Sequence, residues 1–402
     1  MTTPLADDAE LAVQLPALAG YFAPLTVPDP VELPHVQQLC EVSDAYRSDA
    51  EADALFVAAL RETIGWHIRR SDFYRRLWDA GGAVLPGHLD DLPGLPFVHV
   101  NLLKRHRLGS IPEQDVAMRY TSSGTGGERT EIGFDTWTLR SAERMDAWTM
   151  KALGLLDVHR PANYLVYGYE PDPRLTVGAA RGLSELCDFA PVADAVHALR
   201  NTGDGHEFDP MGAVDTLLAY AAGGGPTRIV GFPAFLHATL ERLQTMGVPR
   251  LELAEGSLVL TGGGWKGHAD RAIGRAELRA AVEDRLGIPA ERQRDVYGSV
   301  EHPLFYVECA AHHFHVPVWS RCVVRDVATL APLPHGSPGY LQFLTPFPTA
   351  LPSHSILMAD LGTLHPPGDC SLATPWFEVH GRAGVRRNRN CAVAAAELLE
   401  SR

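Results

Sequence analysis

The sequence is poor in lysine. Lys104, Lys151 and Lys266 are the three lysines among 402 residues, so arginine supplies nearly all of the positive charge. Positive charge is itself in deficit, because 35 lysines and arginines stand against 49 aspartates and glutamates, for a formal net charge of -14. A nucleic-acid-binding protein is expected to carry a basic surface, and anionic membranes attract basic segments. The charge balance therefore argues against both kinds of partner.

Long hydrophobic runs and disulfide-type cysteine patterns are also missing. No apolar segment reaches the length of a membrane span. The first residues include Asp7, Asp8 and Glu10 and lack the basic-then-apolar pattern of a signal peptide. The six cysteines, at positions 40, 187, 309, 322, 370 and 391, are widely scattered, which is typical of reduced thiols. We therefore expect a cytoplasmic globular protein without a membrane span.

The order of the expected elements predicts an α/β protein. Residues 1–50 are rich in proline and acidic residues and are expected to form a peripheral N-terminal segment, and a helical pattern follows over 51–79. Helices are then expected at 137–153, 212–222, 233–246 and 273–286, and strands at 163–168, 227–232, 257–261 and from 296. This alternation predicts a layered fold with a largely parallel sheet. Short strands at 305–309, 315–324, 339–344 and 355–358 predict a β-rich subdomain.

A stretch of glycine and hydroxyl residues over 120–130 is the first candidate site. Its sequence, Tyr-Thr-Ser-Ser-Gly-Thr-Gly-Gly-Glu-Arg-Thr, has three glycines and five serines or threonines. So small and polar a backbone can wrap an anion and offer N–H and hydroxyl groups to phosphate oxygens. It is not a Walker A loop, because no Gly-Lys-Ser/Thr follows the first glycine at the required spacing. A surface turn is the alternative interpretation.

A second glycine-rich segment, residues 261–267, directly follows an expected strand. Gly262, Gly264 and Gly267 satisfy the dinucleotide pattern G-x-G-x-x-G. Against a dinucleotide site, the next acidic residue at a strand end, Asp295, lies about 30 residues on, where that pattern needs about 20. A strand-end loop that lets a flat ligand lie on the backbone, or a tight turn into a helix, are the alternatives.

Two further segments place single carboxylates at strand ends. In residues 295–303, Tyr297 could stack a base, Gly298 gives space, and Glu301 could hold a metal near phosphates. In residues 355–362, an apolar strand ends in Asp360, which suits a ribose diol but is also a common turn residue.

In this order, the four segments resemble the adenylate-forming (ANL) superfamily. Within it the sequence is most similar to the acyl-protein synthetase (LuxE) family, which is related to phenylacetate–CoA ligases. The resemblance extends over about residues 50 to 391 and includes residues 233–237, 315–319, 325–326 and 339–344. It implies that residues 51–380 form the large N-terminal domain of these enzymes, with helix-flanked sheets plus the β-rich subdomain. Residues 381–402 would be a short, truncated C-terminal portion.

The resemblance implies a two-step reaction with ATP and Mg²⁺ as cofactors. A carboxylate would attack the α-phosphate of ATP to give an acyl-adenylate, and a thiol would then take the acyl group. By the same resemblance, Glu301 of this sequence would hold Mg²⁺. The implied ATP-binding residues are Ser122, Ser123, Gly124, Thr125, Gly126, Gly127, Arg129, Thr130, Gly262, Gly263, Gly264, Tyr297, Gly298 and Asp360.

The C-terminal residues depart from the superfamily pattern. Its enzymes bring a catalytic lysine from a mobile C-terminal domain, but no lysine follows Arg382 here. Lys266, Arg382 or a partner protein could supply the positive charge. Cys391 follows three arginines, which favour a thiolate. In the acyl-protein synthetases a cysteine near the C-terminus carries the acyl group toward a reductase, so Cys391 is the expected acceptor; an incidental thiol is the alternative.

The sequence specifies the carboxylic acid substrate less clearly than the ATP site. Phe232, Phe235, Trp265 and His302 lie where a carboxylic acid could sit, although they are equally suited to a core. Bulky aromatics would shorten a pocket and favour an aryl or short acid over a fatty one. A CoA or carrier-protein ligase, an NAD-binding dehydrogenase and a non-catalytic nucleotide-binding homologue are the alternative functions. An acyl reductase or another thiol-bearing protein is the expected partner, and the sequence leaves a homo-oligomer open.

One cluster of sulfur and imidazole residues does not belong to these motifs. Cys309, His312, His313, His315 and Cys322 lie within fourteen residues. This density could bind zinc, but the spacing matches no standard zinc pattern. Strand alternation places His313 and His315 on one face. From the sequence we favour packing or substrate contact over zinc.

Overall fold

The computed structural model describes residues 8–121, 131–172, 178–265, 268, 271–368 and 370–383. Its helices are α1 (Asp8–Gln14), α2 (Pro34–Leu39), α3 (Ala50–Arg70), α4 (Asp72–Gly81), α5 (Val100–Arg105), α6 (Thr136–Ala152), α7 (Gly178–Glu185), α8 (Pro210–Gly223), α9 (Pro233–Thr245) and α10 (Arg275–Leu286). Its strands are β1 (Val98–His99), β2 (Met118–Thr121), β3 (Glu131–Phe134), β4 (Ala162–Tyr169), β5 (Val192–Asn201), β6 (His206–Phe208), β7 (Thr227–Gly231), β8 (Leu258–Gly262), β9 (Gln293–Ser299), β10 (His302–Val307), β11 (Phe314–His315), β12 (Arg321–Arg325), β13 (Pro338–Leu344), β14 (Ser355–His365) and β15 (Trp376–Arg382).

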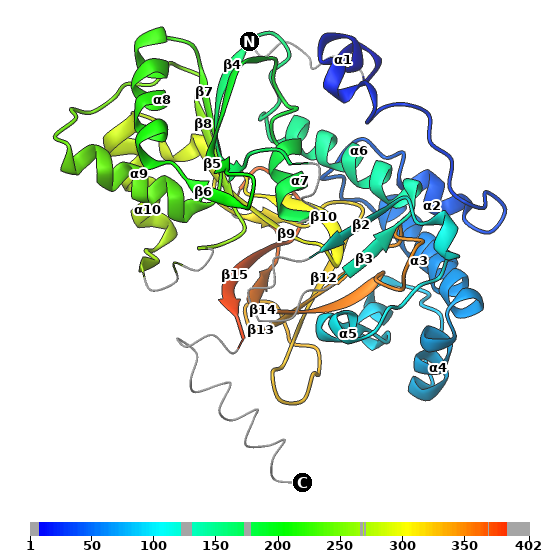
Figure 1. Ribbon diagram of the computed structural model, residues 1–402. Coiled ribbons are helices and arrows are strands. Elements are labelled where there is room, and N and C mark those ends of the chain that lie inside the picture. Colours follow the sequence, from blue (N-terminus) through cyan, green and yellow to red (C-terminus); the bar gives the residue numbers. More distant parts are fainter. Residues whose placement is uncertain are drawn as a thin grey trace.

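The larger sheet has seven strands in the order β10-β9-β8-β7-β4-β5-β6. Its five central strands are parallel, and β10 and β6 pair antiparallel at the two edges. All five residues of β7 are buried, as is usual for a strand covered on both faces. Figure 1 shows α8, α9 and α10 gathered on one side of this sheet and α6 on the other. The prediction of a largely parallel sheet flanked by helices is confirmed.

The smaller sheet contains the β-rich part of the chain. Its strands follow the order β11-β15-β14-β13-β12, and the short β1 pairs with β14. All of these pairs are antiparallel except β1 with β14. The segment 315–324, expected as one strand, forms parts of β11 and β12 with a turn between them, and β14 runs on to His365. The β-rich subdomain is therefore confirmed, with corrected strand limits.

The helical pattern over 51–79 divides into two helices at Ser71. Ser71 has an extended backbone (φ -122°), and its side chain caps α4 by accepting the Tyr74 N–H at 3.4 Å. A serine that ends one helix can begin the next, because its hydroxyl satisfies an N–H group left free in the first turn. The apolar periodicity continues across this break, which explains why the pattern alone gives one helix.

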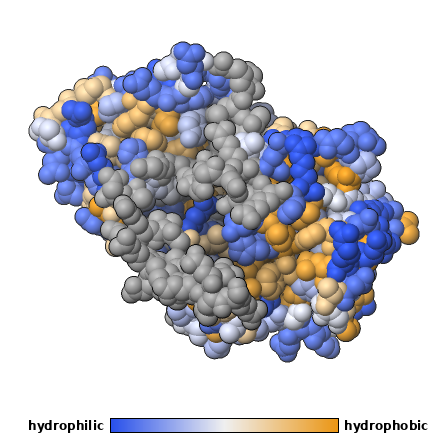
Figure 2. Space-filling view, turned by 60° about the horizontal axis from the view of Figure 1, so that its bottom comes forward, coloured by the Kyte–Doolittle hydropathy of each residue, from blue (hydrophilic) through white to orange (hydrophobic). Residues whose placement is uncertain are grey.

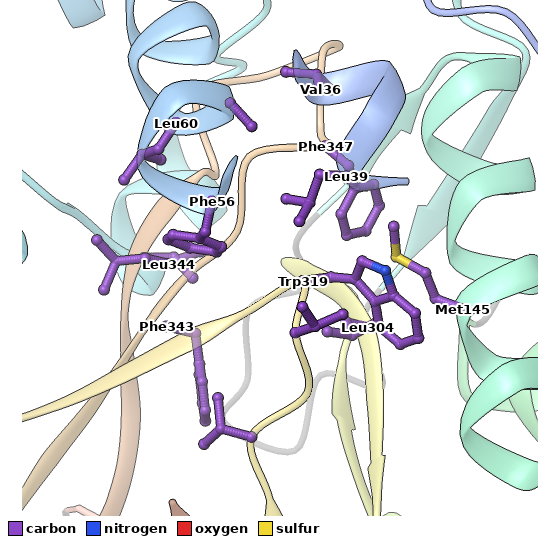
Figure 3. Close-up of a cluster of buried hydrophobic side chains, with 14 of the residues drawn as sticks. Val36, Leu39, Phe56, Leu60, Met145, Leu304, Trp319, Phe343, Leu344 and Phe347 are labelled. Carbon is purple, nitrogen blue, oxygen red and sulfur yellow. The ribbon is translucent and has the colours of Figure 1, made fainter. Parts of the chain in front are cut away.

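The core joins segments that are far apart in sequence. Figure 3 shows side chains from α2, α3, α6, β10 and β13 meeting around Trp319, which is fully buried. The described part of the N-terminal segment also contributes to the core. Leu11 and Leu18 pack with the residues of the larger sheet, and Val36 and Leu39 pack with those of the smaller sheet.

The exposed surface mixes residues of both kinds. Figure 2 shows hydrophobic areas on one face, each bordered by hydrophilic residues. Within the described residues, no helix combines the length and the apolar character that crossing a membrane requires.

Two buried histidines make the fold sensitive to acid. The two ring nitrogens of His67 lie 2.7 Å from Ser110 Oγ and 3.1 Å from the Pro348 carbonyl oxygen. His302 packs between the rings of Tyr306 and Phe343. Burial lowers the pKa of both residues from 6.5 to about 3. The folded protein therefore holds both imidazoles neutral, whereas the unfolded chain takes up protons as the pH falls below 6.5.

We predict that the contribution of His67 and His302 to the free energy of unfolding is largest above pH 6.5 and is lost as the pH is lowered from 6.5 toward 3. Each histidine contributes up to about 1.4 kcal/mol per pH unit, because the unfolded state binds more protons in this window. Urea midpoints measured at a series of pH values check this. His302→Phe should reduce the slope, whereas His335→Gln, at an exposed position, should not. An unchanged slope in His302→Phe would contradict the assignment.

Candidate functional site

The candidate residues converge at the carboxyl ends of neighbouring strands. β7, β8 and β9 are parallel, so their carboxyl ends meet at one edge of the larger sheet. In open α/β sheets, ligands bind in the crevice outside these ends. β8 ends at Gly262 and β9 ends at Ser299, two residues after Tyr297.

The backbone after β8 requires glycine. Gly262 pairs with Val296 of β9, and a Cβ at Gly262 would lie 2.8 Å from the Val296 carbonyl oxygen. Gly263 and Gly264 have φ angles of 73° and 68°, in the left-handed region that disfavours other residues. The three glycines therefore form a turn whose backbone carries no side chains. Contact between that backbone and a ligand remains a prediction.

Asp360 connects the two sheets chemically. The hydroxyl of Tyr297, on β9 of the larger sheet, donates to Asp360 Oδ2 at 3.0 Å. Arg382 lies directly opposite Asp360 in the β14–β15 ladder, and its Nε is 3.5 Å from Asp360 Oδ1. Both oxygens of the carboxylate are thus engaged by residues named from the sequence. The structure brings these three predicted site residues together.

Opposing effects act on the pKa of Asp360, and their net result is a raised pKa. Its side chain is 13% exposed, and burial raises its pKa; Arg382 and the Tyr297 hydroxyl act in the opposite direction. Glu301 raises the pKa further, which places the two carboxylates within electrostatic range of each other. Burial also raises the pKa of Tyr297, so its phenol stays protonated and can donate. The arrangement is a hydrogen-bond acceptor held between a phenol and a guanidinium.

Aromatic packing fixes the Tyr297 ring. Its ring contacts Tyr306 of the larger sheet and Phe314, Phe343 and Phe377 of the smaller sheet, with centroid distances from 5.7 to 6.3 Å. All four contacts are tilted or edge-on, the geometry that aromatic pairs prefer. The ring therefore has little freedom to rotate, and its hydroxyl is directed at Asp360.

Gly298 and Glu301 complete the turn after Tyr297. A Cβ at Gly298 would lie 2.7 Å from the Phe305 ring, so the position has room only for glycine unless Phe305 moves. Glu301 is 6% exposed, donates its N–H to Ser299 Oγ at 3.2 Å, and accepts a hydrogen bond from the same hydroxyl. Ser299 thus orients the Glu301 carboxylate, a role that the sequence did not indicate.

The four predicted substrate residues fall into two groups. The ring centroids of Phe232 and Phe235, at the junction of β7 and α9, lie 6.2 Å apart. The ring centroid of Trp265 lies 5.6 Å from that of His237, a residue of α9. His302 is 1% exposed and packs instead against Tyr306 and Phe343, with its Nε2 2.8 Å from the Tyr306 hydroxyl. His302 therefore lies in the aromatic core beside Tyr297 and apart from the Phe232 group.

Other predicted residues lie outside the described residues. These are Ser122, Ser123, Gly124, Thr125, Gly126, Gly127, Arg129 and Thr130, together with Lys266 and Cys391. The two strands that flank the first group are described: β2 pairs antiparallel with β3, and Thr121 lies opposite Glu131. The described residues on either side of 122–130, Thr121 and Glu131, are therefore adjacent.

The described backbone does not favour the dinucleotide alternative. α10 begins at Arg275, well after the glycines at 262–264, whereas a dinucleotide motif opens directly into its helix. Asp295, the acid considered for a ribose, is bound by Arg275, whose Nε lies 2.9 Å from Oδ2. Burial raises the pKa of Asp295 to about 6.

Arg275 also lines a cavity of about 320 Å³, together with Arg279, Glu308, His312 and Phe377.

Comparison with known proteins identifies relatives among ligases. The model of the family described as acyl-protein synthetase, LuxE, matches residues 205–400. The long-chain-fatty-acid–luciferin-component ligases of Vibrio harveyi and Aliivibrio fischeri are 23% and 24% identical; each alignment covers 84–85% of this chain and 86–88% of the relative. The phenylacetate-coenzyme A ligase of Thermus thermophilus is 25% identical over 74% of this chain and 62% of its own length.

A solved structure supports the same relationship at the level of fold. The 2-hydroxyisobutyryl-CoA ligase, in an open conformation with 2-HIB-AMP and CoA, aligns over 90% of this chain and 80% of that chain, with a TM-score of 0.62 and 16% identity. The expected fold class is therefore confirmed. The chain is therefore similar to acyl-protein synthetases (LuxE) over residues 205–400 and to phenylacetate–CoA ligases over most of its length, and it shares its fold with a CoA ligase.

Proposed function

We propose that this protein is an acid–thiol ligase that activates a carboxylic acid with ATP and transfers the acyl group to a thiol. The observation that carries the proposal is the hydrogen bond of 3.0 Å between Tyr297 and Asp360, formed at the carboxyl ends of the parallel strands beside the glycine turn 262–264. The similarity to luciferin-component ligases and to a phenylacetate–CoA ligase supports it. We assign the reaction to residues 51–380, with residues 381–402 as a short segment that presents Cys391.

ATP would lie across this edge of the sheet. Tyr297 and the backbone of residues 262–264 would flank the adenine, and the carboxylate of Asp360 would accept hydrogen bonds from the ribose hydroxyls. Asp360 suits this task because Arg382 and Tyr297 counteract the effect of burial on its pKa. Gly298 keeps the turn close to the ligand. The hydroxyls and backbone amides of loop 122–130, with Arg129, would hold the β- and γ-phosphates.

The carboxylate of Glu301 fits a magnesium ion that accompanies ATP. Mg²⁺ in such sites is commonly bound by one or two protein carboxylates together with substrate phosphates. Glu301 is buried and oriented by Ser299, and its charge acts on Asp360, so it faces the same region. A bound Mg²⁺ would offset the negative charge of the phosphates.

The chemistry proceeds in two displacements. In the first, an oxygen of the substrate carboxylate attacks the α-phosphorus, and the bond to pyrophosphate breaks. In the second, a thiolate attacks the acyl carbon, AMP leaves, and a thioester forms. Both steps develop negative charge that a positive group would stabilise. We assign this role to Arg382 or Lys266, or to a partner protein, because the sequence has no lysine beyond position 266.

The acceptor decides between two forms of the proposal. We favour Cys391 as the first acceptor, with transfer to an acyl reductase or another thiol protein, as in an acyl-protein synthetase. A CoA or carrier-protein ligase is the second candidate, favoured by the similarity to phenylacetate–CoA ligase. The five cysteines of the described residues are free thiols, which supports a cytoplasmic location. Phe232, Phe235 and Trp265 favour an aryl or short acid, whereas the luciferin-component ligases are named for long-chain fatty acids.

We predict that the wild-type protein catalyses acid-dependent exchange between ATP and pyrophosphate with one member of a panel of fatty and aryl acids. Intact-mass spectrometry should show an acyl adduct that is absent in Cys391→Ser, because the serine hydroxyl is a much weaker nucleophile. Exchange should persist in this variant. Exchange without an adduct in the wild type would favour the CoA or carrier-protein ligase, and the absence of exchange with every acid would contradict the proposed activation.

We predict that Asp360→Asn raises the KM for ATP by about 10- to 100-fold, because the variant loses a charged acceptor for the ribose hydroxyls. Tyr297→Phe should have a smaller effect in the same direction, since it retains the ring and removes only the hydroxyl. Steady-state kinetics of exchange at varied ATP check both. Asp79→Asn, at an exposed position on α4, is the matched control. A KM for ATP equal to wild type in Asp360→Asn would remove Asp360 from the nucleotide site.

A further inference from the structure

Four potential metal ligands meet outside the candidate nucleotide site. Cys309, His313, His315 and Cys370 each offer one ligand atom, and these atoms all lie within 4.8 Å of one another. Cys309 and His313 come from the turn between β10 and β11, and His315 is the last residue of β11. Cys370 comes from the segment that precedes β15 and lies 55 residues beyond His315.

The backbone holds the two segments together independently of these side chains. His315 pairs with Trp376 in the antiparallel β11–β15 ladder. In the turn, the Cys309 N–H donates to the His313 carbonyl oxygen at 2.9 Å, and the His312 N–H donates to the Cys309 carbonyl oxygen at 2.9 Å. The four side chains are therefore brought together by the fold, and their distances do not depend on one flexible loop.

The orientation of His315 is that of a metal ligand. Its Nδ1 lies 3.0 Å from the carbonyl oxygen of Thr374, which can only accept, so Nδ1 carries the proton. Its Nε2 then presents a lone pair, and this atom lies 3.0 Å from Cys370 Sγ. Metal-binding histidines characteristically donate their second ring nitrogen to a carbonyl or carboxylate in this way.

The other ligands are also held in place. The ring of His313 stacks on Trp376 with centroids 3.7 Å apart. The Leu372 N–H donates to Cys370 Sγ at 3.4 Å, an interaction that stabilises a thiolate. Tyr46 packs edge-on against His315 and helps to close the site from solvent.

We propose that Cys309, His313, His315 and Cys370 bind one zinc ion as a structural site that fastens β15 to β11. Two thiolates and two imidazoles form the tetrahedral S₂N₂ set that selects zinc over magnesium or calcium. Binding of Zn²⁺ releases the two thiol protons to solvent, and the two thiolate charges balance the metal. All four positions are filled by protein, so the ion stabilises structure and leaves no position open for a substrate.

The proposed zinc site differs from the expectation drawn from the sequence, because one of its four ligands, Cys370, lies outside residues 309–322. Among the five residues clustered within 309–322, His312 interacts with Glu308, with Nδ1 3.4 Å from a carboxylate oxygen, and Cys322 lies on β12. Neither belongs to the group of four. Cys370 takes the remaining place, and no spacing rule based on residues 309–322 would include it.

The proposed ion also acts on the nucleotide site through β15. This strand carries Arg382, which pairs with Asp360 of β14. A metal that fixes the start of β15 limits the movement of the strand against β14. The metal site itself does not depend on the proposed ligase activity, and its occupancy can be measured without substrate.

Metal analysis of the full-length protein, purified without a histidine tag, tests the proposal. We expect about one zinc per chain by mass spectrometry of the metal content. Cys370→Ser should lose at least tenfold in zinc affinity, whereas Cys322→Ser, a half-buried cysteine on β12, should keep the wild-type affinity. A zinc affinity of Cys370→Ser equal to that of the wild type, measured by competition with a chelator, would overturn the proposal, as would wild-type protein that neither contains nor takes up zinc. So would a Cys309–Cys370 disulfide in the metal-free protein purified under reducing conditions.

A second measurement uses the wild type alone, in case a variant fails to fold. Replacement of zinc by Co²⁺ should give the thiolate charge-transfer and tetrahedral bands of an S₂N₂ site. Removal of the metal by a chelator should lower the melting temperature and speed hydrogen exchange in β15, while exchange in β7 stays unchanged. A cobalt spectrum without thiolate bands would overturn the ligand set. Unchanged exchange in β15 would overturn its role as a fastening.

Discussion

The contact between Tyr297 and Asp360 is the constraint on which the candidate site depends. It requires that β9 of the larger sheet and β14 of the smaller sheet hold a fixed position, because a hydrogen bond of 3.0 Å tolerates little displacement. The aromatic rings of Tyr306, Phe314, Phe343 and Phe377 meet this requirement by packing around Tyr297 from both sheets. The side chains that pack the core between the two sheets therefore also fix the geometry of the candidate site.

The electrostatics of the site follow from this burial. Removing Asp360 from water would favour its protonated form, which is a poor acceptor for two hydroxyls. Arg382 and the protonated phenol of Tyr297 counteract that effect, and Glu301 opposes them. The net effect is a raised pKa for Asp360, with burial as its largest cause. A neutral residue at position 382 would shift this balance toward the protonated acid.

Local sequence patterns predicted the parts of the fold that rest on local physics. β4, β7 and β8 of the larger sheet are mostly buried runs, and α9 has clear limits, so these four elements were located within one or two residues. Gly262 was placed correctly at the end of β8 and Tyr297 near the end of β9, whereas Asp360 lies in the middle of β14, which continues to His365. Pattern alone missed β15 and the break at Ser71. β15 lies between β14, which directly precedes it in the chain, and β11, which is distant in sequence; the break depends on a single cap.

Side-chain neighbourhoods were less predictable, because they depend on long-range packing. For His302 the sequence left substrate contact and core packing equally open, and the fold packs it against the rings of Tyr306 and Phe343. Cys370 is brought to Cys309 only by the pairing of β11 with β15. Ser299 orients Glu301 through a turn that the motif does not specify. In each case the sequence supplies the residue type, and the tertiary fold decides its partner.

In the first step of the proposed reaction, a substrate carboxylate attacks the α-phosphorus of ATP. The most direct measurement follows ¹⁸O from a doubly labelled carboxylic acid into the nucleotide product. We expect one labelled oxygen in AMP, because the bond between that oxygen and phosphorus survives when the thiol attacks the acyl carbon. Label in inorganic phosphate with ADP as the product would mean attack at the γ-phosphorus and would contradict adenylate formation.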